Sequence, residues 1–202
     1  MASRLGDQTA RMQGRITLNP MYHVDPVGTL LLPALMIFGP LLGGGALTGY
    51  LIGWAKPTPV ITRNFKNIVR DDSLVTLAGP VSNLLLAFCG FCGLVVIILF
   101  TRHLPSQQNA LNSSINALGA LCELAILVNL ALFFFNLLPI PPLDGSRLLR
   151  NFLPYNAAMS YDRLQGWLGL ILMIAIGGPV VRFFLRPTMS FIYFALSRIQ
   201  GS

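Results

Sequence analysis

A single aspartate that follows three prolines is the part of this sequence best suited to chemistry. Asp144 comes after the prolines of residues 139–142, at the end of an apolar run over residues 118–138. Prolines remove backbone donors and end helices, so we expect Asp144 on irregular chain at or below a membrane surface. A carboxylate there is costly unless it binds something, and its oxygens are suitable metal ligands. Because Gly145 also leaves the adjacent backbone free, this block predicts a binding site.

A second polar position interrupts an earlier apolar run. Residues 78–83 read Ala-Gly-Pro-Val-Ser-Asn, and the Gly79-Pro80 pair is expected to open or kink a helix. Asn83 then lies on an otherwise apolar span. Two interpretations remain open: Asn83 bonds across packed helices while Gly79 lets them approach, or it donates to a substrate carbonyl or an oxyanion.

The composition predicts a membrane protein. The chain has 202 residues, of which 54% are apolar and only 10% are charged, whereas a soluble domain has roughly 25% charged residues. The net charge of +7 comes from Lys and Arg in short loops between apolar runs, where positive charge orients membrane proteins. We therefore expect the lipid bilayer as a partner, and no nucleic acid.

The apolar runs predict an all-α polytopic membrane protein with three to four transmembrane helices. A re-entrant hairpin and a short β-ribbon near the cytoplasmic face are expected in addition, because glycines and prolines interrupt one run and residues 15–18 have strand propensity. A short apolar stretch, 189–196, is expected at the membrane interface. The single membrane-embedded domain, 1–202, divides into a polar strand and turn region (1–27), a re-entrant or transmembrane segment (28–53), a basic loop (54–73) and three transmembrane helices (74–100, 118–138 and 164–184).

The distribution of charge predicts the orientation. Lys and Arg gather in residues 54–72 and 139–163, whereas residues 101–117 contain only Arg102. The positive-inside rule places the first two segments in the cytoplasm and the third outside. Asp144 would then lie toward the cytoplasmic side of a multi-pass protein of a bacterial inner or plasma membrane.

Five ordered motifs resemble one known family, the compact bacterial site-2 proteases. These are intramembrane zinc metalloproteases without a PDZ domain. The resemblance implies that Asp144 is the third zinc ligand and that Asn83 belongs to the active site. It also implies a short strand near the active site, with Trp54, Lys56 and Pro57 at its start, that binds an extended substrate by strand addition. The motifs that carry the resemblance are residues 14–20, 23–26, 53–57, 78–83 and 136–145.

The sequence departs from this family at its most important motif. The family takes two zinc ligands and a general base from H-E-x-x-H on a membrane helix, but the chain has only His23, His103 and Glu123. In relatives the motif immediately precedes the stretch that residues 2–7 resemble. Either Met1 is an internal methionine mistaken for a start, or the gene has lost its catalytic helix. The intact remaining motifs favour the first interpretation.

The two histidines do not replace the missing ligands. His103 is expected to be a solvated residue on the outer side, opposite Asp144. His23 follows the turn signal Asn19-Pro20, and one His with one Asp cannot complete the three-ligand site that catalytic zinc needs. We interpret His23 as a turn-stabilising residue or as one that supports a ligand. Asn136 and Gly145 are assigned structural or supporting roles beside Asp144.

Three functional hypotheses follow. The first is a zinc metalloendopeptidase that cleaves transmembrane or membrane-proximal peptide segments and is inactive as the chain stands. The second is a non-catalytic pseudoprotease that binds transmembrane segments, supported by the missing H-E-x-x-H. The third is a small transporter that uses Asp144 and Glu123 as ion sites, but the halves of the sequence show no inverted repeat.

Overall fold

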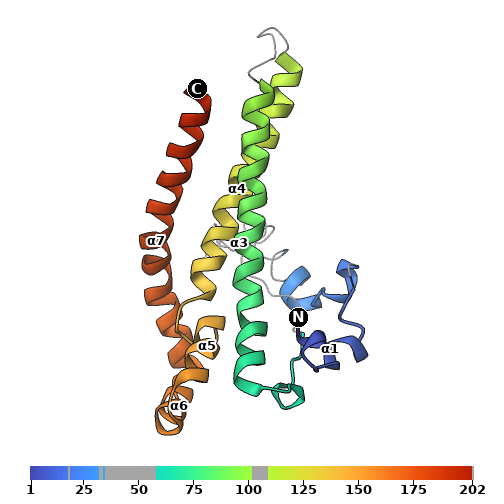
Figure 1. Ribbon diagram of the computed structural model, residues 1–202, viewed down its shortest axis with the longest axis vertical. Helices are drawn as coiled ribbons and strands as arrows, with labels where there is room; N and C mark the ends of the chain where they lie inside the picture. Colours follow the sequence, from blue (N-terminus) through green and yellow to red (C-terminus); the bar gives the residue numbers. More distant parts are fainter. Residues whose placement is uncertain (18, 32–33, 35–57, 102–108, 202) are drawn as a thin grey trace. The chain divides into compact units, whose positions relative to one another are not determined.

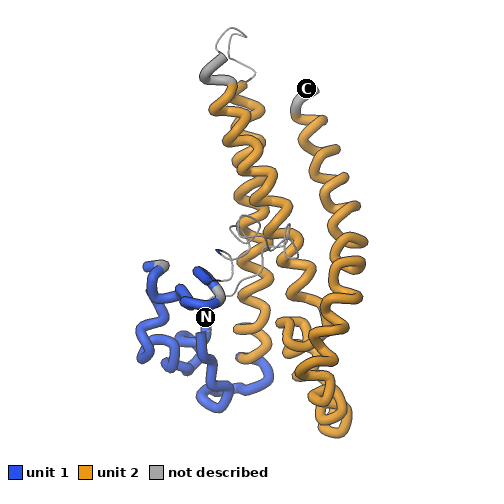
Figure 2. The backbone as a smooth tube through the Cα atoms, turned by 180° about the vertical axis from the view of Figure 1, so that it is seen from behind, with its two compact units in different colours: residues 1–71 blue, residues 72–202 orange. Residues whose placement is uncertain are grey.

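The computed structural model describes residues 1–17, 19–31, 34, 58–101 and 109–201. These residues form two compact units, Met1–Asp71 and Asp72–Ser202 (Figure 2). Trp54, Lys56 and Pro57, His103, and most of the expected re-entrant segment 28–53 lie outside the described residues. The division of the sequence as one domain remains a prediction.

Three long helices confirm the expected polytopic all-α architecture. They are α3 (Ile68–Thr101), α4 (Asn109–Asn136) and α7 (Trp167–Gly201) (Figure 1). Each contains a stretch that is long and apolar enough to cross a membrane. Two short helices, α5 (Asp144–Phe152) and α6 (Tyr155–Asp162), lie between α4 and α7 in the sequence.

Prolines do not interrupt these helices as the sequence suggested. Pro80 lies inside α3, so the Gly79-Pro80 pair does not open the helix, and α7 continues through Pro179 and Pro187. The expectation of a separate interfacial segment at 189–196 is therefore wrong, because these residues belong to α7. A membrane helix tolerates a proline because neighbouring helices, Ser or Thr side chains and small local adjustments can satisfy the backbone group that the proline frees. The expected loop 54–73 is also too long, since α3 begins at Ile68.

Small residues bring α3 and α4 together in the second unit. A Cβ at Gly90 would lie 3.1 Å from Cγ1 of Ile126, and a Cβ at Gly93 would lie 3.0 Å from Sγ of Cys122. Small side chains at such positions let membrane helices pack closely. The buried core of this bundle contains Ala87 and Leu94 of α3, Ile126 and Leu130 of α4, and Leu196 of α7.

Asp7 organises the first unit. Its side chain is fully buried, and its carboxylate accepts hydrogen bonds from the Ile61 backbone N–H at 2.9 Å and from Asn64 Nδ2 at 2.9 Å. Thr9 donates to the same carboxylate through its backbone N–H and its hydroxyl. Gly6 has a φ of +115°, and a Cβ there would lie 2.7 Å from the Asn64 carbonyl oxygen. These contacts join residues 6–9 to residues 61–64.

The rest of the first unit consists of short helical turns and irregular chain. The described residues contain no β-strand, and 15–17 and 58–60 are irregular, so the β-ribbon is not confirmed. His23 Nε2 lies 3.0 Å from the carbonyl oxygen of Thr17 and forms a hydrogen bond with it. The helical turns are Ala2–Arg4, α1 (Thr9–Met12), Pro20–Tyr22, Pro26–Leu31 and Thr62–Asn64.

Candidate functional site

Asp144 is the first residue of a helix, which corrects the expectation of irregular chain. Helix α4 ends at Asn136, and the irregular segment that follows ends at Leu143, whose extended backbone precedes α5. Only the prolines of residues 139–142 prevent helix formation here, so the helix resumes once they have passed. The partial positive charge at a helix N-terminus favours a carboxylate at this position.

Gly145 allows α5 to start against the end of α4. A Cβ at Gly145 would lie 2.2 Å from the carbonyl oxygen of Leu137 and 2.6 Å from that of Leu138. Gly145 does not have a positive φ, so close approach is the physical reason for glycine here. The same segment is held from the other side, because the Tyr161 hydroxyl donates to the Pro139 carbonyl oxygen at 2.7 Å.

The structure brings two of the sequence-predicted motifs together. A Cβ built at Gly79 would lie 3.1 Å from Oδ2 of Asp144, so the carboxylate rests against the backbone of α3. Asn83 lies one turn further along the same face of α3. It is partly exposed, and its side-chain amide makes no hydrogen bond with another described residue. An amide in this position is available to a further group near Asp144.

Burial and a nearby cation have opposite effects on the pKa of the Asp144 carboxyl group. Burial raises the pKa of its carboxyl group above the ordinary value, while the positive charge of Arg147 acts to lower it. Arg147 lies one turn further along α5. Asp144 is thus a partly dehydrated carboxylate beside a cation and near an apolar helix surface.

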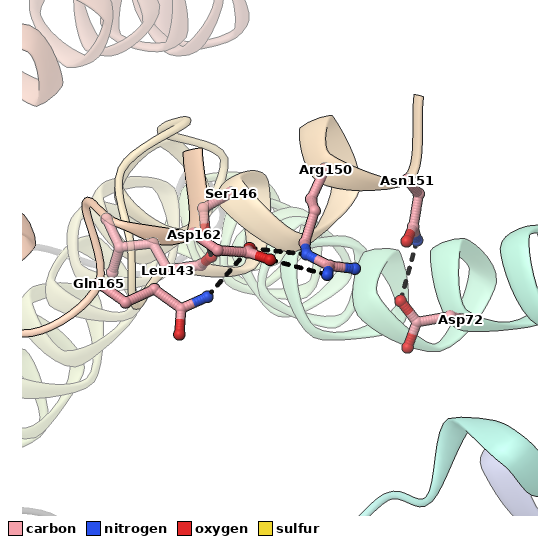
Figure 3. Close-up of polar contacts among 7 residues, drawn as sticks. All are labelled: Asp72, Leu143, Ser146, Arg150, Asn151, Asp162 and Gln165. Atoms are coloured by element: carbon pink, nitrogen blue, oxygen red, sulfur yellow. Dashed lines mark hydrogen bonds and ion pairs between the residues drawn. The ribbon is translucent and has the colours of Figure 1, made fainter. Parts of the chain in front are cut away.

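Sequence reasoning missed a polar cluster that joins α5 to α3. Asp72 is buried, with an exposed fraction of 5%. Its carboxylate accepts a hydrogen bond from Arg147 Nη2 at 2.8 Å. It accepts a second from Asn151 Nδ2 at 2.9 Å (Figure 3). Asn151 also donates to Oγ of Ser73 at 3.2 Å. The one available signal was an acidic residue directly before a long apolar run, in a segment otherwise rich in Lys and Arg.

Glu123 lies far from Asp144 within the same unit. It lines a cavity of about 400 Å³ together with Ile98 and Thr101 of α3, whereas Asp144 lies against Gly79. Nineteen residues of helix between Gly79 and Ile98 correspond to about 28 Å. The two acids therefore do not form one ion site.

The described residues do not fit a complete zinc site by themselves. Among them, no group of three or more His, Cys, Asp or Glu side chains is placed to hold a metal ion. Catalytic zinc takes three protein ligands, and Asp144 supplies one carboxylate. His23 belongs to the first unit, Met1–Asp71, where its ring forms a hydrogen bond with the carbonyl oxygen of Thr17.

Comparison with known proteins identifies the family. The model of peptidase family M50 matches residues 53–176, which include Asn83 and Asp144. "Putative zinc metalloprotease YwhC" of Bacillus subtilis is 35% identical over 190 residues, which cover 94% of this chain and 77% of the relative. "Putative zinc metalloprotease Rip2" of Mycolicibacterium smegmatis is 31% identical over 181 residues, covering 89% of this chain and 60% of the relative. No solved structure matches the chain. The chain belongs to peptidase family M50, the family of the site-2 proteases, as its motifs predicted.

Proposed function

We propose that the protein is an intramembrane zinc metalloendopeptidase, in which Asp144 is one zinc ligand. One observation supports this most: in an M50 chain, Asp144 lies with its carboxylate against Gly79 of a membrane-spanning helix. The remaining ligands would come from outside the described residues. The substrates would be membrane-embedded or membrane-proximal peptide segments.

The position of Gly79 supports a site inside the apolar layer. Gly79 lies five residues after Leu74, where the apolar part of α3 begins, which corresponds to about 7.5 Å along the helix axis. The carboxylate would therefore be reached from one membrane face at shallow depth. We infer that this face is cytoplasmic, because Arg147, Arg150 and Arg163 gather near it in the sequence.

Asn83 is proposed to contact the substrate. It lies about 6 Å further along α3 than Gly79, on the same face, and its side-chain amide has no described hydrogen-bond partner. Its amide would donate to the carbonyl or oxyanion of the bond to be cleaved. A helical substrate hides its peptide bonds, so it must unwind before cleavage. We propose that Trp54, Lys56 and Pro57 bind the unwound segment as an added strand.

The alternative is a pseudoprotease that binds transmembrane segments without cutting them. The observation in its favour is that the described residues hold no three-ligand metal group. The two hypotheses differ in whether zinc and cleavage appear together once the missing ligands are supplied.

A comparison of two forms of the protein tests the proposal. One form is the 202-residue chain, and the other carries a membrane helix with the family's H-E-x-x-H motif fused in front of Met1. Zinc content after purification in detergent and cleavage of a model transmembrane peptide are measured for both. We expect the chain as given to hold no stoichiometric zinc and to cut nothing, and the extended form to bind zinc and cleave in a chelator-sensitive way.

Two outcomes would contradict this proposal. Tightly held, stoichiometric zinc in the chain as given would show that its own residues complete a site, with His23 as the first candidate ligand. An extended form that binds the peptide but neither holds zinc nor cleaves it would establish the pseudoprotease.

A further inference from the structure

Helix α5, which starts with Asp144, contacts α3 at two points. At one end the Asp144 carboxylate lies against Gly79. At the other end Asn151 donates to the buried carboxylate of Asp72. Two separate contacts fix both the place and the direction of a helix, whereas one contact would let α5 rotate about it.

The spacing of these contacts shows that α5 runs alongside α3 in the opposite direction. Seven residues separate Asp72 from Gly79, and seven separate Asp144 from Asn151. Each interval corresponds to about 10.5 Å of helix. The two contacts are therefore equally far apart on α3 and on α5. A shift of α5 by one turn would break both contacts.

We propose that Asp72 is a positioning residue that holds Asp144 in place through α5. Its carboxylate binds Arg147 and Asn151 and thereby keeps the first turn of α5 against Gly79. Both carboxylate oxygens of Asp72 already accept these hydrogen bonds, so Asp72 acts through α5. The importance of this role for catalysis rests on the proposed function of Asp144 as a zinc ligand. The placement of α5 by Asp72 is independent of that function.

The second ion pair of α5 provides a matched control. Arg150 binds Asp162 through two hydrogen bonds, at 2.7 and 2.8 Å (Figure 3). This pair is more exposed than the Asp72 cluster, and it links α5 to the end of α6 rather than to α3. A variant at Asp162 thus removes an ion pair of α5 without touching the contact with α3.

Disulfide cross-linking measures the position of residue 144 without zinc. Gly79→Cys and Asp144→Cys are introduced into the full chain, in a background where Cys89, Cys92 and Cys122 are replaced by alanine, and the membranes are oxidised with copper–phenanthroline. The pair should cross-link readily because a Cβ at Gly79 would lie 3.1 Å from Oδ2 of Asp144. We expect Asp72→Ala to slow the cross-link about tenfold, since a buried cluster loses its shared acceptor. Asp72→Asn, which keeps one carbonyl acceptor, should slow it less, and Asp162→Ala should change it less than about twofold.

A second cysteine pair separates local displacement from general unfolding. In a separate background that keeps Cys122 but replaces Cys89 and Cys92 by alanine, Gly93→Cys places a thiol beside Cys122, because a Cβ at Gly93 would lie 3.0 Å from its Sγ. This cross-link between α3 and α4 should form equally well in the Asp72→Ala variant. An unchanged rate for the 79–144 pair in Asp72→Ala would overturn the proposal. Equal loss of both cross-links would also overturn it, because Asp72 would then be needed for folding of the bundle. Neither result depends on zinc, so failure of the metal assignment is distinguishable from failure of this role.

Discussion

Replacement of Gly145 by alanine should displace the start of α5 while leaving the membrane bundle intact. The added Cβ would lie 2.2 Å from the Leu137 carbonyl oxygen, at least 0.8 Å closer than the 3.0 Å that real Cβ atoms keep. The neighbour is backbone and cannot rotate away, so α5 must move as a unit. Overpacking of this kind costs about 1–3 kcal/mol, and backbone contacts lie at the upper end of that range.

Thermal unfolding in detergent measures this effect against a matched glycine. Gly119 lies inside α4, and a Cβ there would have no neighbour within 4 Å. Gly119→Ala should therefore raise stability slightly, by up to about 1 kcal/mol, through helix propensity. Gly145→Ala should lower the melting temperature and move residue 144 away from Gly79. Equal or higher stability for Gly145→Ala would refute the argument that close approach requires glycine at this position.

Two further predictions concern other parts of the chain. Hydrogen bonds from Thr9 and Asn64 hold the pKa of Asp7 well below its ordinary value, so its contribution to stability is complete above about pH 5 and is lost progressively as the pH falls further. Limited proteolysis of the first unit should accelerate between pH 5 and pH 2 in the wild type, whereas Asp7→Asn should be sensitive at every pH; a wild-type rate independent of pH would contradict the role of this carboxylate. For the orientation, a cysteine at Tyr155, whose side chain is 77% exposed, should react with impermeant reagents only from the cytoplasm, and one at Gln107 only from outside. The opposite sidedness would reverse the orientation.

The spanning helices could be predicted from the sequence, but their ends could not. Long apolar runs identify α3, α4 and α7 because a bilayer requires them. Hydropathy does not record where a helix stops in water, so the polar first turns of α3 before Leu74 were missed. The third span was expected to end at residue 184, whereas α7 continues through Pro187 to Gly201.

The candidate site could be predicted only in part, because local sequence marks some of its residues but does not show contacts between distant ones. Asp144 is marked by local sequence, since a carboxylate beside a block of prolines at the end of an apolar run is unusual. Asp72, which binds α5 through Arg147, is separated from Arg147 by 75 residues, and charge pairs across helices leave no local pattern. The sequence also did not reveal why residue 145 is glycine. The reason is the close approach of the Leu137 carbonyl oxygen, and not a turn at Gly145 itself.

The most direct test of the central claim compares two variants in a form of the protein that cleaves a model transmembrane substrate. Asp144→Asn keeps the shape of the side chain but loses the anionic oxygen that would hold zinc, so zinc content and cleavage should fall together. Asn83→Ala should leave the metal bound while slowing cleavage on the order of 10²–10³-fold. If Asp144→Asn binds zinc and cleaves at the full rate, Asp144 is only the first residue of a helix, and the assignment of the site is wrong.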